Sequence, residues 1–409
     1  MTKGFVGGGL LTALLLTGCG SSAPAAPASV AAPQSSSAAP ASAAPASSAP
    51  VASSAAGGAS ASGAASASAS PASSAGAAQQ TIAGVTVAPL AQRAKLRLSF
   101  NPSIIVYLPL LLAQDKGYFA KAGIDLDVLA YNGSSSTQLP LLAKGDIDVT
   151  PVVPNPALFN QAAQGFTDKI VAAMNLPKQG RVSDTWIVVM KDEASQIKDL
   201  KDLKGKSVDA GSTGGPMDFL VENALTAGGL DPNKDVTLSH KSKDVTTMLE
   251  LARNHAVDAM GMTEPVVTQL EKEGMIVRWK TYSDIIPWYQ AAQLAASAQY
   301  MQANHAALEK FLEVYVLSSR EINASNGAWT DDLLRIATSA TKMQPDVIKG
   351  QGGVPYFGPN ATVSLDSLDR VQSFWVDNAQ VKQKVDPRQM VDTSVLDEAL
   401  AKTGKQPES

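Results

Sequence analysis

Glycines and hydroxyl side chains gather in a turn that follows an expected strand, a combination that suits the binding of a small molecule. The turn is Gly211-Ser212-Thr213-Gly214-Gly215, between an expected strand (207–210) and an expected helix (217–227). Glycine lets backbone N–H groups approach a ligand closely, and the N–H groups at a helix start are free to donate. A Walker phosphate loop is excluded because no Lys-Ser/Thr pair follows these glycines. We expect ligand contacts from the middle of the turn: Ser212, Thr213 and Gly214.

Two further turns earlier in the chain have the same character. Asn132-Gly133-Ser134-Ser135-Ser136-Thr137 precedes an expected helix, and the segment 101–107 follows an expected strand and ends in an aromatic residue. Serine and threonine at a helix start also cap the helix, so a structural role and a ligand role are both open. The aromatic residue could stack on a planar ligand or fill the core. The candidates from these turns are Ser103, Tyr107, Ser134 and Ser135.

Four candidates stand alone in the sequence. Asn155, in Pro154-Asn155-Pro156, follows an expected strand, and its amide can both donate and accept hydrogen bonds. Glu264 lies in the turn Thr263-Glu264-Pro265. Trp186 and Trp288 could stack on an aromatic ligand. A structural role is equally open for Asn155, Glu264 and Trp288.

Catalytic and metal-binding motifs are missing from the sequence. His240, His255 and His305 are scattered without metal-ligand spacing, and neither H-E-x-x-H nor a serine nucleophile elbow is present. A single cysteine, Cys19, cannot form an internal disulfide or a multi-cysteine zinc site. We therefore expect no catalytic residue, no metal site and no cofactor.

The first residues predict a secreted and lipid-anchored chain. One early charge, Lys3, is followed by an apolar run up to Leu16 that is too short to span about 30 Å of hydrocarbon. The run ends in Leu16-Thr17-Gly18-Cys19, which resembles the lipobox of bacterial lipoproteins. That resemblance implies that residues 1–18 are a signal peptide and that Cys19 carries acyl chains such as palmitate, which hold a protein on a membrane.

Residues 20–80 consist almost wholly of Ala, Ser, Gly and Pro, with no charged and no aromatic side chain. Such a segment has too little apolar surface to offset the entropy cost of ordering. As a flexible coil, roughly 60 residues would reach about 45 Å. We expect a tether, which we extend from Cys19 to residue 92.

The remaining residues predict a globular α/β protein with two lobes. Strands and helices alternate through the first part of this region, and helical spacing dominates after Gln293, which favours mainly parallel sheets flanked by helices. About 320 residues exceed the usual size of a single core. The chain has 33 basic and 37 acidic side chains, a net charge of -4 and no basic stripe, so nucleic acid is not an expected partner.

Four segments occur in an order that resembles one family of binding proteins. They are Ala113-Gln114-Asp115-Lys116-Gly117-Tyr118-Phe119, Ala122-Gly123-Ile124-Asp125-Leu126-Asp127, Leu141-Leu142-Ala143-Lys144-Gly145-Asp146-Ile147-Asp148-Val149 and Ile197-Lys198-Asp199-Leu200-Lys201-Asp202-Leu203-Lys204-Gly205-Lys206-Ser207-Val208. Ala252 to Ala259 repeats the third pattern, with Asn254-His255 in place of the common glycine. Together these segments resemble the periplasmic binding proteins for nitrate, sulfonates, taurine and thiamine precursors.

The resemblance implies a type II periplasmic-binding-protein fold, in which two α/β lobes hold the ligand between them. By analogy, lobe 1 comprises residues 93–184 and, after the return of the chain, 288–400; lobe 2 comprises 185–287, and 401–409 form a tail. The chain would cross between the lobes near 184–187 and 286–290.

The resemblance also implies a receptor of an ABC importer that is not an enzyme. Its expected partners are a small organic solute, an ABC permease with its ATPase, and the membrane through the lipid anchor. The protein itself would be an extracytoplasmic monomer, on the periplasmic side in a host with two membranes. Two alternatives are an enzyme of the thiamine-precursor type and a sensor lipoprotein.

The class of solute is only partly restricted by these residues. Nitrate or a sulfonate would favour cationic donors, and the predicted turns have only Lys178 and Arg181 nearby. A neutral or planar compound, such as a pyrimidine, a vitamin precursor or a flavin, would use the hydroxyls, amides and aromatic rings. Helix N-termini alone can bind anions, so both classes stay open.

Overall fold

The computed structural model describes residues 79–131, 135–176, 178 and 183–408. These residues belong to one compact unit, 72–409. The predicted signal peptide, the predicted lipidation site Cys19 and the predicted ligand residue Ser134 lie outside the described residues, as does the side chain of Ser135. In the part that is described, none of the helices combines the length and the apolar character needed to cross a membrane.

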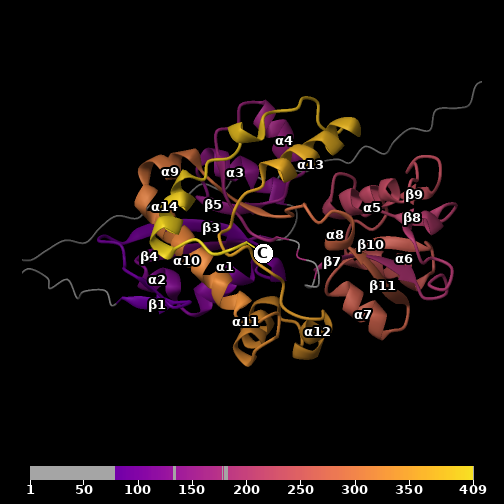
Figure 1. Ribbon diagram of the computed structural model, residues 1–409, viewed down its shortest axis with the longest axis horizontal. Coiled ribbons are helices and arrows are strands. Elements are labelled where there is room, and N and C mark those ends of the chain that lie inside the picture. Colours follow the sequence, from indigo (N-terminus) through magenta and orange to yellow (C-terminus); the bar gives the residue numbers. More distant parts are fainter. Residues whose placement is uncertain (1–78, 132–134, 177, 179–182, 409) are drawn as a thin grey trace, which may run out of the picture. The chain divides into compact units, whose positions relative to one another are not determined.

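The first of two five-stranded sheets has four strands that run in the same direction (Figure 1). The exception is β12, which lies antiparallel to both of its neighbours, β5 and β6. In sheet order, the strands are β4 (Ile124–Ala130), β3 (Ala94–Phe100), β5 (Val149–Val152), β12 (Gln293–Ala296) and β6 (Lys169–Ala173).

The second sheet has the same pattern, with β7 as the strand that runs against the other four. In sheet order, it contains β11 (Ile276–Thr281), β7 (Thr185–Met190), β10 (Ala259–Thr263), β8 (Ser207–Asp209) and β9 (Thr237–Ser239). The prediction of an α/β protein with two mainly parallel sheets is therefore confirmed. In each sheet the reversed strand is the first one formed after the chain crosses over from the other sheet.

Helices flank both sheets, and the last part of the chain is mainly helical, as its sequence periodicity predicts (Figure 1). Before the first crossing lie α1 (Leu108–Asp115), α2 (Tyr118–Lys121), α3 (Leu139–Lys144) and α4 (Pro156–Ala163). The second sheet carries α5 (Pro216–Ala227), α6 (Val245–Arg253), α7 (Val266–Lys272) and α8 (Tyr282–Ile285). The return segment forms α9 (Ala298–Ala303), α10 (His305–Asn323), α11 (Asp331–Thr341), α12 (Pro345–Gly350), α13 (Leu365–Asp377) and α14 (Ser394–Thr403). Short 3-10 turns occur at Ile105–Tyr107, Ser135–Thr137, Leu200–Leu203 and Pro387–Gln389.

A β-hairpin occupies residues that the sequence assigned to the tether. Its strands are β1 (Gln80–Ile82) and β2 (Val85–Val87), paired antiparallel. Ile82 and Val87 are buried in the same core cluster as the central helix α10, which the hairpin contacts. The folded part therefore begins at about residue 80 rather than 93, because these two apolar side chains have a core to pack against.

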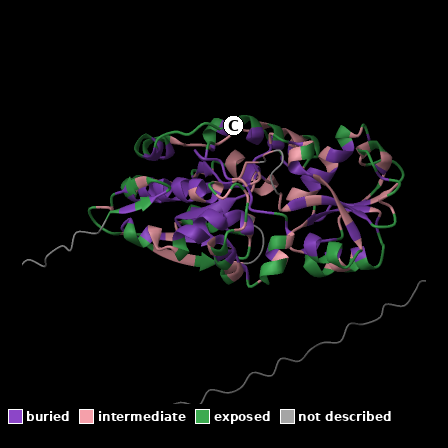
Figure 2. Ribbon diagram, turned by 60° about the horizontal axis from the view of Figure 1, so that its bottom comes forward, coloured by how far each residue is buried: buried purple, intermediate pink, exposed green. Residues whose placement is uncertain are grey.

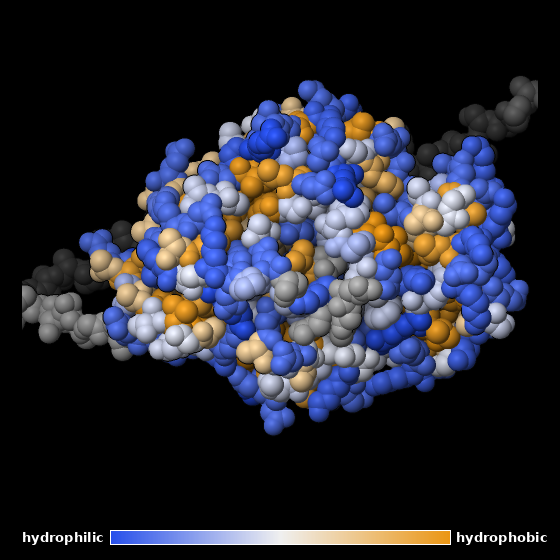
Figure 3. All heavy atoms as spheres, viewed as in Figure 1, coloured by the Kyte–Doolittle hydropathy of each residue, from blue (hydrophilic) through white to orange (hydrophobic). Residues whose placement is uncertain are grey.

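The core consists of three clusters of buried apolar side chains, which Figure 2 shows along the strands and the inner helices. One cluster contains residues of both sheets, such as Val152 of β5 and Ile187 of β7. The chain passes between the sheets twice, between β6 and β7 and between β11 and β12. Exposed large apolar side chains are few among the described residues, and the face in Figure 3 is mostly hydrophilic with scattered apolar patches.

Candidate functional site

A cavity of about 220 Å³ is lined by residues from both sheets and from both crossings. From the first sheet come the loop after β3 and the residues that follow β5 and β6; from the second come the end of β10 and the start of α5. Ligand sites of α/β proteins occur outside the carboxyl ends of parallel strands, and these strands end at the cavity. The lining residues are Ser103, Ile104, Ile105, Val106, Tyr107, Val153, Asn175, Asp184, Thr185, Pro216, Met217, Thr263, Glu264, Tyr282, Ala291, Ala292, Met343 and Gln351.

Tyr107 forms a rigid part of the cavity wall. Its side chain is buried, and its ring meets that of Phe100 edge-on with 5.9 Å between the centroids. Burial, together with the neighbouring Tyr131 and the carboxylate of Asp184, raises the pKa of Tyr107 far above its ordinary value. The phenol therefore stays neutral, and its hydroxyl already has a hydrogen-bond partner in Tyr131.

Two carboxylates, Asp184 and Glu264, give the cavity its charge. Burial raises the pKa of both groups above the ordinary value of a carboxylic acid. Glu264 lies 3.0 Å from the guanidinium of Arg278, which is not a lining residue, and it accepts hydrogen bonds from the backbone and side chain of Thr268. Among the side-chain hydrogen bonds of the described residues, the carboxylate of Asp184 accepts only one. It comes from the hydroxyl of Thr185 and is long, at 3.3 Å. Neither lysine nor arginine occurs among the described lining residues of this cavity, but Lys178 lines a neighbouring pocket that shares Asn175, Asp184 and Tyr282 with it.

Three of the residues predicted from the sequence line this cavity: Ser103, Tyr107 and Glu264. Ser212, Thr213 and Gly214 form the turn just before the lining residues Pro216 and Met217, but they are not part of the lining. The N–H of Gly214 donates to the carboxylate of Asp218 at 2.8 Å, so the turn holds the start of α5 in place.

The other predicted residues with described side chains do not line the cavity, and each has a structural partner. Asn155 caps α4, because its side-chain oxygen accepts the N–H of Leu158 at 3.0 Å. The indole of Trp186 donates to the carbonyl of Ser183 at 3.0 Å. Trp288 packs edge-on against Phe219, and the guanidinium of Arg370 lies 5.1 Å from its ring centroid.

Several lining residues have no motif that marks them in the sequence. Asp184 is the one with a usable signal, because it lies at the predicted first crossing, where the two lobes meet. Met343 and Gln351 come from the helical return segment, and Tyr282 begins the four-residue helix α8. Nothing in their local sequence indicates a ligand site.

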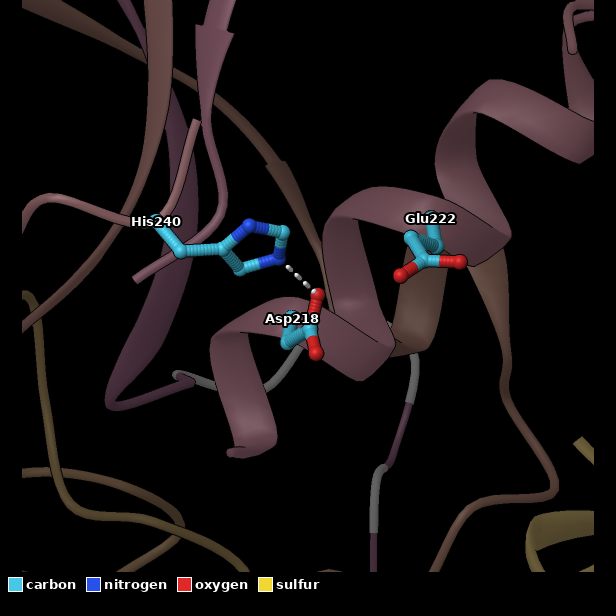
Figure 4. A group of neighbouring side chains, drawn as sticks. All are labelled: Asp218, Glu222 and His240. Atoms are coloured by element: carbon cyan, nitrogen blue, oxygen red, sulfur yellow. Dashed lines mark hydrogen bonds and ion pairs between the residues drawn. The ribbon is translucent and has the colours of Figure 1, made fainter. Parts of the chain in front are cut away.

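A second group of ionisable side chains lies near the start of α5 (Figure 4). Asp218 and Glu222 are one helical turn apart, and the Nε2 atom of His240 lies 2.8 Å from Oδ1 of Asp218. Burial and the neighbouring Asp218 carboxylate raise the pKa of Glu222 to about 7. None of the three lines the cavity. The sequence shows His240 far from any metal-ligand pattern, and the fold brings it to two carboxylates.

Comparison with known proteins identifies relatives that are named as binding proteins. The "Putative binding protein YtlA" of Bacillus subtilis is 24% identical over 248 residues, which cover 60% of this chain and 70% of that protein. The "Nitrate/nitrite binding protein NrtA" of Synechocystis is 24% identical over 296 residues, covering 68% of this chain and 64% of the relative.

The fold is shared with solved structures. The periplasmic aliphatic sulphonate binding protein SsuA of Escherichia coli superposes with a TM-score of 0.60 at 20% identity, covering 73% of this chain and 92% of that one. Residues 105–322, more than half of the sequence, match the family described as "NMT1/THI5 like". This chain therefore belongs to the NMT1/THI5-like family.

Proposed function

We propose that this protein is the extracytoplasmic solute-binding component of an ABC importer, and that it binds a small organic solute without transforming it. The observation that carries the proposal is the cavity of about 220 Å³, to which both sheets and both crossings contribute lining residues. A solute in this cavity contacts both lobes and both crossings, and these move relative to one another when the lobes rotate. Closure of two domains around a ligand is how periplasmic binding proteins report that they are loaded.

The proposed lobes are those expected from the sequence, 93–184 with 288–400 and 185–287, with the first lobe extended to include the hairpin at 80–87. The crossings supply Asp184 and Thr185 on one side and Ala291 and Ala292 on the other. Contacts at a hinge couple binding to closure, because they change when the hinge angle changes. The permease then distinguishes the loaded from the empty protein by its shape.

The lining favours a neutral or cationic solute over the anions named for NrtA and SsuA. Glu264 has its counter-charge in Arg278, whereas Asp184 forms no ion pair among the described residues. Lys178 lines an adjoining pocket with Asp184, but its ammonium lies over the ring of Tyr356, 4.5 Å from the centroid. An anion placed beside Asp184 would be repelled by this carboxylate when it is ionised. A hydrogen-bond donor, such as an amine or an amino-substituted ring, would be attracted.

The size of the cavity favours a small solute. Pockets for drug-sized ligands measure roughly 300–1,000 Å³, and this one is smaller at about 220 Å³. A pyrimidine or a comparably small amine fits this description better than a flavin. We propose that Ser103, Tyr107 and Asp184 orient the solute. Met217 and Tyr282 form the apolar part of the wall.

The proposed partners are an ABC permease and its ATPase, and the proposed anchor is an acylated Cys19 in the outer leaflet of the cytoplasmic membrane or in the outer membrane. The protein itself is proposed to be a monomer. Replacement Cys19→Ala should release the protein from the membrane fraction, and Ser21→Ala is the matched control that should leave it there. Full membrane association of the Cys19→Ala protein would contradict the anchor.

The proposal is tested by a thermal-shift screen of the full chain against pyrimidines, small amines, thiamine, riboflavin, taurine, alkyl sulfonates and nitrate. A solute at 100 times its Kd adds about 2.7 kcal/mol of stability, which is a shift of a few degrees for a protein of this size. Hits among the neutral or cationic compounds would support the proposal. Hits confined to nitrate and sulfonates would contradict the proposed solute class while leaving the receptor function in place.

Two measurements on a confirmed solute separate the receptor from its alternatives. Recovery of the solute unchanged after long incubation is expected of a binder, and conversion to product would identify an enzyme. Small-angle scattering should show a smaller radius of gyration with the solute, because the lobes close. Uptake into vesicles that contain the permease and ATPase distinguishes a transport receptor from a sensor, which would not support it.

A further inference from the structure

Three side chains with metal-ligand chemistry converge outside the cavity (Figure 4). Asp218 and Glu222 occupy positions i and i+4 of α5, so they project from the same face of the helix. His240 comes from the segment that follows β9 and points its ring at Asp218, with 2.8 Å between Nε2 and Oδ1. One ring nitrogen of His240, one carboxylate oxygen of Asp218 and one carboxylate oxygen of Glu222 lie within 4.8 Å of one another.

This cluster lacks a cationic partner of its own. The side chain of Asp218 is fully buried, and Glu222 is half-buried. Among the residues that the structure describes, no lysine or arginine forms an ion pair with either carboxylate; Asp218 contacts His240, and Glu222 interacts with Asp218. Buried carboxylates are normally paired with a cation or bound to a metal, because burying an isolated charge is costly.

A hydrogen bond from outside the cluster holds one oxygen of each carboxylate, and the remaining contacts of the two carboxylates lie within the cluster. Oδ2 of Asp218 accepts the N–H of Gly214 at 2.8 Å, while Oδ1 faces His240. Oε2 of Glu222 accepts the amide of Asn378 at 2.9 Å. In known metal sites, the side chains that bind the ion are regularly oriented by further hydrogen bonds of this kind from neighbouring residues.

We propose that Asp218, Glu222 and His240 bind one divalent transition-metal ion, with zinc as the best match. An imidazole with two carboxylates is a nitrogen and oxygen ligand set that suits zinc and its neighbours better than magnesium or calcium, which prefer oxygen alone. Zinc with three protein ligands retains a fourth position for water. The ion replaces the direct contact between His240 and Asp218 and supplies the positive charge that the two carboxylates lack.

The metal site is separate from the solute site. None of the three ligands lines the cavity, although Asp218 directly follows the lining residue Met217 in α5. A bound ion would fix α5 to the segment after β9 and so hold the start of α5, where Pro216 and Met217 face the cavity, in position. The proposal does not depend on the importer function, since a protein of any activity with this cluster would bind the ion.

The test is equilibrium dialysis of the full chain, without a histidine tag and without solute, against zinc ions, followed by elemental analysis. One zinc per chain is expected for the native protein. The variants Glu222→Gln and His240→Gln should each weaken zinc binding at least tenfold. Glu222→Gln keeps a side-chain oxygen for Asn378, so its thermal unfolding in the presence of EDTA should match that of the native protein. Cobalt ions offer an independent readout, because a visible absorption band is expected on binding to the native protein and not to the variants.

His305→Gln is the matched control. His305 also contacts a carboxylate, Glu398, at 2.8 Å, but this pair is not part of a three-ligand group in the described chain. The control should bind zinc like the native protein. Absence of bound zinc in the native protein, or equal binding by the native protein and both cluster variants, would overturn the proposal. Solute binding by the native protein in EDTA would show that the two sites are independent.

Discussion

Oε1 of Glu264 lies 3.0 Å from Nη2 of Arg278, and only the first of these two residues lines the cavity. The same guanidinium donates to the hydroxyl of Thr268 at 2.7 Å and to the carbonyl of Gly350 at 3.0 Å. Arg278 belongs to β11 of the second sheet, whereas Gly350 ends α12 in the return segment. The pair therefore neutralises a carboxylate of the cavity and joins two distant parts of the chain.

Replacement Arg278→Met is predicted to lower the free energy of unfolding by about 3–5 kcal/mol, the usual cost of removing one partner from a buried ion pair. Burial raises the pKa of Glu264, and Arg278 opposes this effect, so the variant should contain more protonated Glu264 at neutral pH. Urea denaturation measures the loss. The double variant Glu264→Gln with Arg278→Met should recover part of it, and a double loss equal to the sum of the single losses would contradict the coupling.

Replacement Asp184→Asn is predicted to change which solutes bind. A cationic or donor solute should lose at least tenfold in affinity, about 1.4 kcal/mol, and an anion should bind more tightly. Because burial already raises the pKa of Asp184, the neutral amide should cost the fold little. Calorimetry on each solute measures the change, with Asp192→Asn on the exposed surface as the control. Unchanged affinity for a confirmed solute would show that Asp184 is not a ligand contact.

Replacement Asp209→Asn is predicted to destabilise the second sheet by at least about 2 kcal/mol, because the carboxylate accepts several hydrogen bonds in a buried position. Its donors are the hydroxyls of Ser239 and Ser242 and the N–H groups of Gly211, Lys241 and Ser242. Urea denaturation at neutral pH measures the difference between the native protein and the variant.

The stability that Asp209 contributes is also predicted to depend on pH. Burial alone would raise the pKa of Asp209, but the hydrogen bonds outweigh burial and lower it. A carboxylate whose folded-state pKa is lowered stabilises the fold fully above its unfolded value of about 4 and loses this contribution as the pH falls further. The difference between native protein and variant should therefore shrink below about pH 4. A difference that grows in acid would contradict this assignment.

Replacement Phe219→Ala is predicted to lower the free energy of unfolding by about 3–5 kcal/mol, as is usual for a large buried ring. Phe219 of α5 is 1% exposed, and its ring lies 4.8 Å from that of Phe374 and 4.9 Å from that of Tyr289. Phe219→Leu, which leaves a smaller void, should lose less. Thermal and urea unfolding measure the stability losses of the two variants. A loss below about 1 kcal/mol for the alanine variant would contradict the buried packing of this ring.

Much of the fold could be predicted because its elements carry their own periodicity. The strand expected at 207–210 is β8 (Ser207–Asp209), and the helix expected at 217–227 is α5 (Pro216–Ala227). The hairpin β1–β2 was instead assigned to the tether, because each of its strands has only three residues and the core that they pack against lies elsewhere in the chain.

Part of the cavity lining was predictable because it lies in segments that follow strands. Ser103, Tyr107 and Glu264 come from such segments and line the cavity, whereas Trp186 and Trp288 have rings whose direction depends on what they pack against. The sequence by itself determined the α/β character and the family, and it predicted a lipid-anchored, tethered chain with a ligand site at strand ends. Only the tertiary structure decided that Asp184, Met217 and Gln351 share one cavity and that His240 meets Asp218, because packing of distant segments sets both distances.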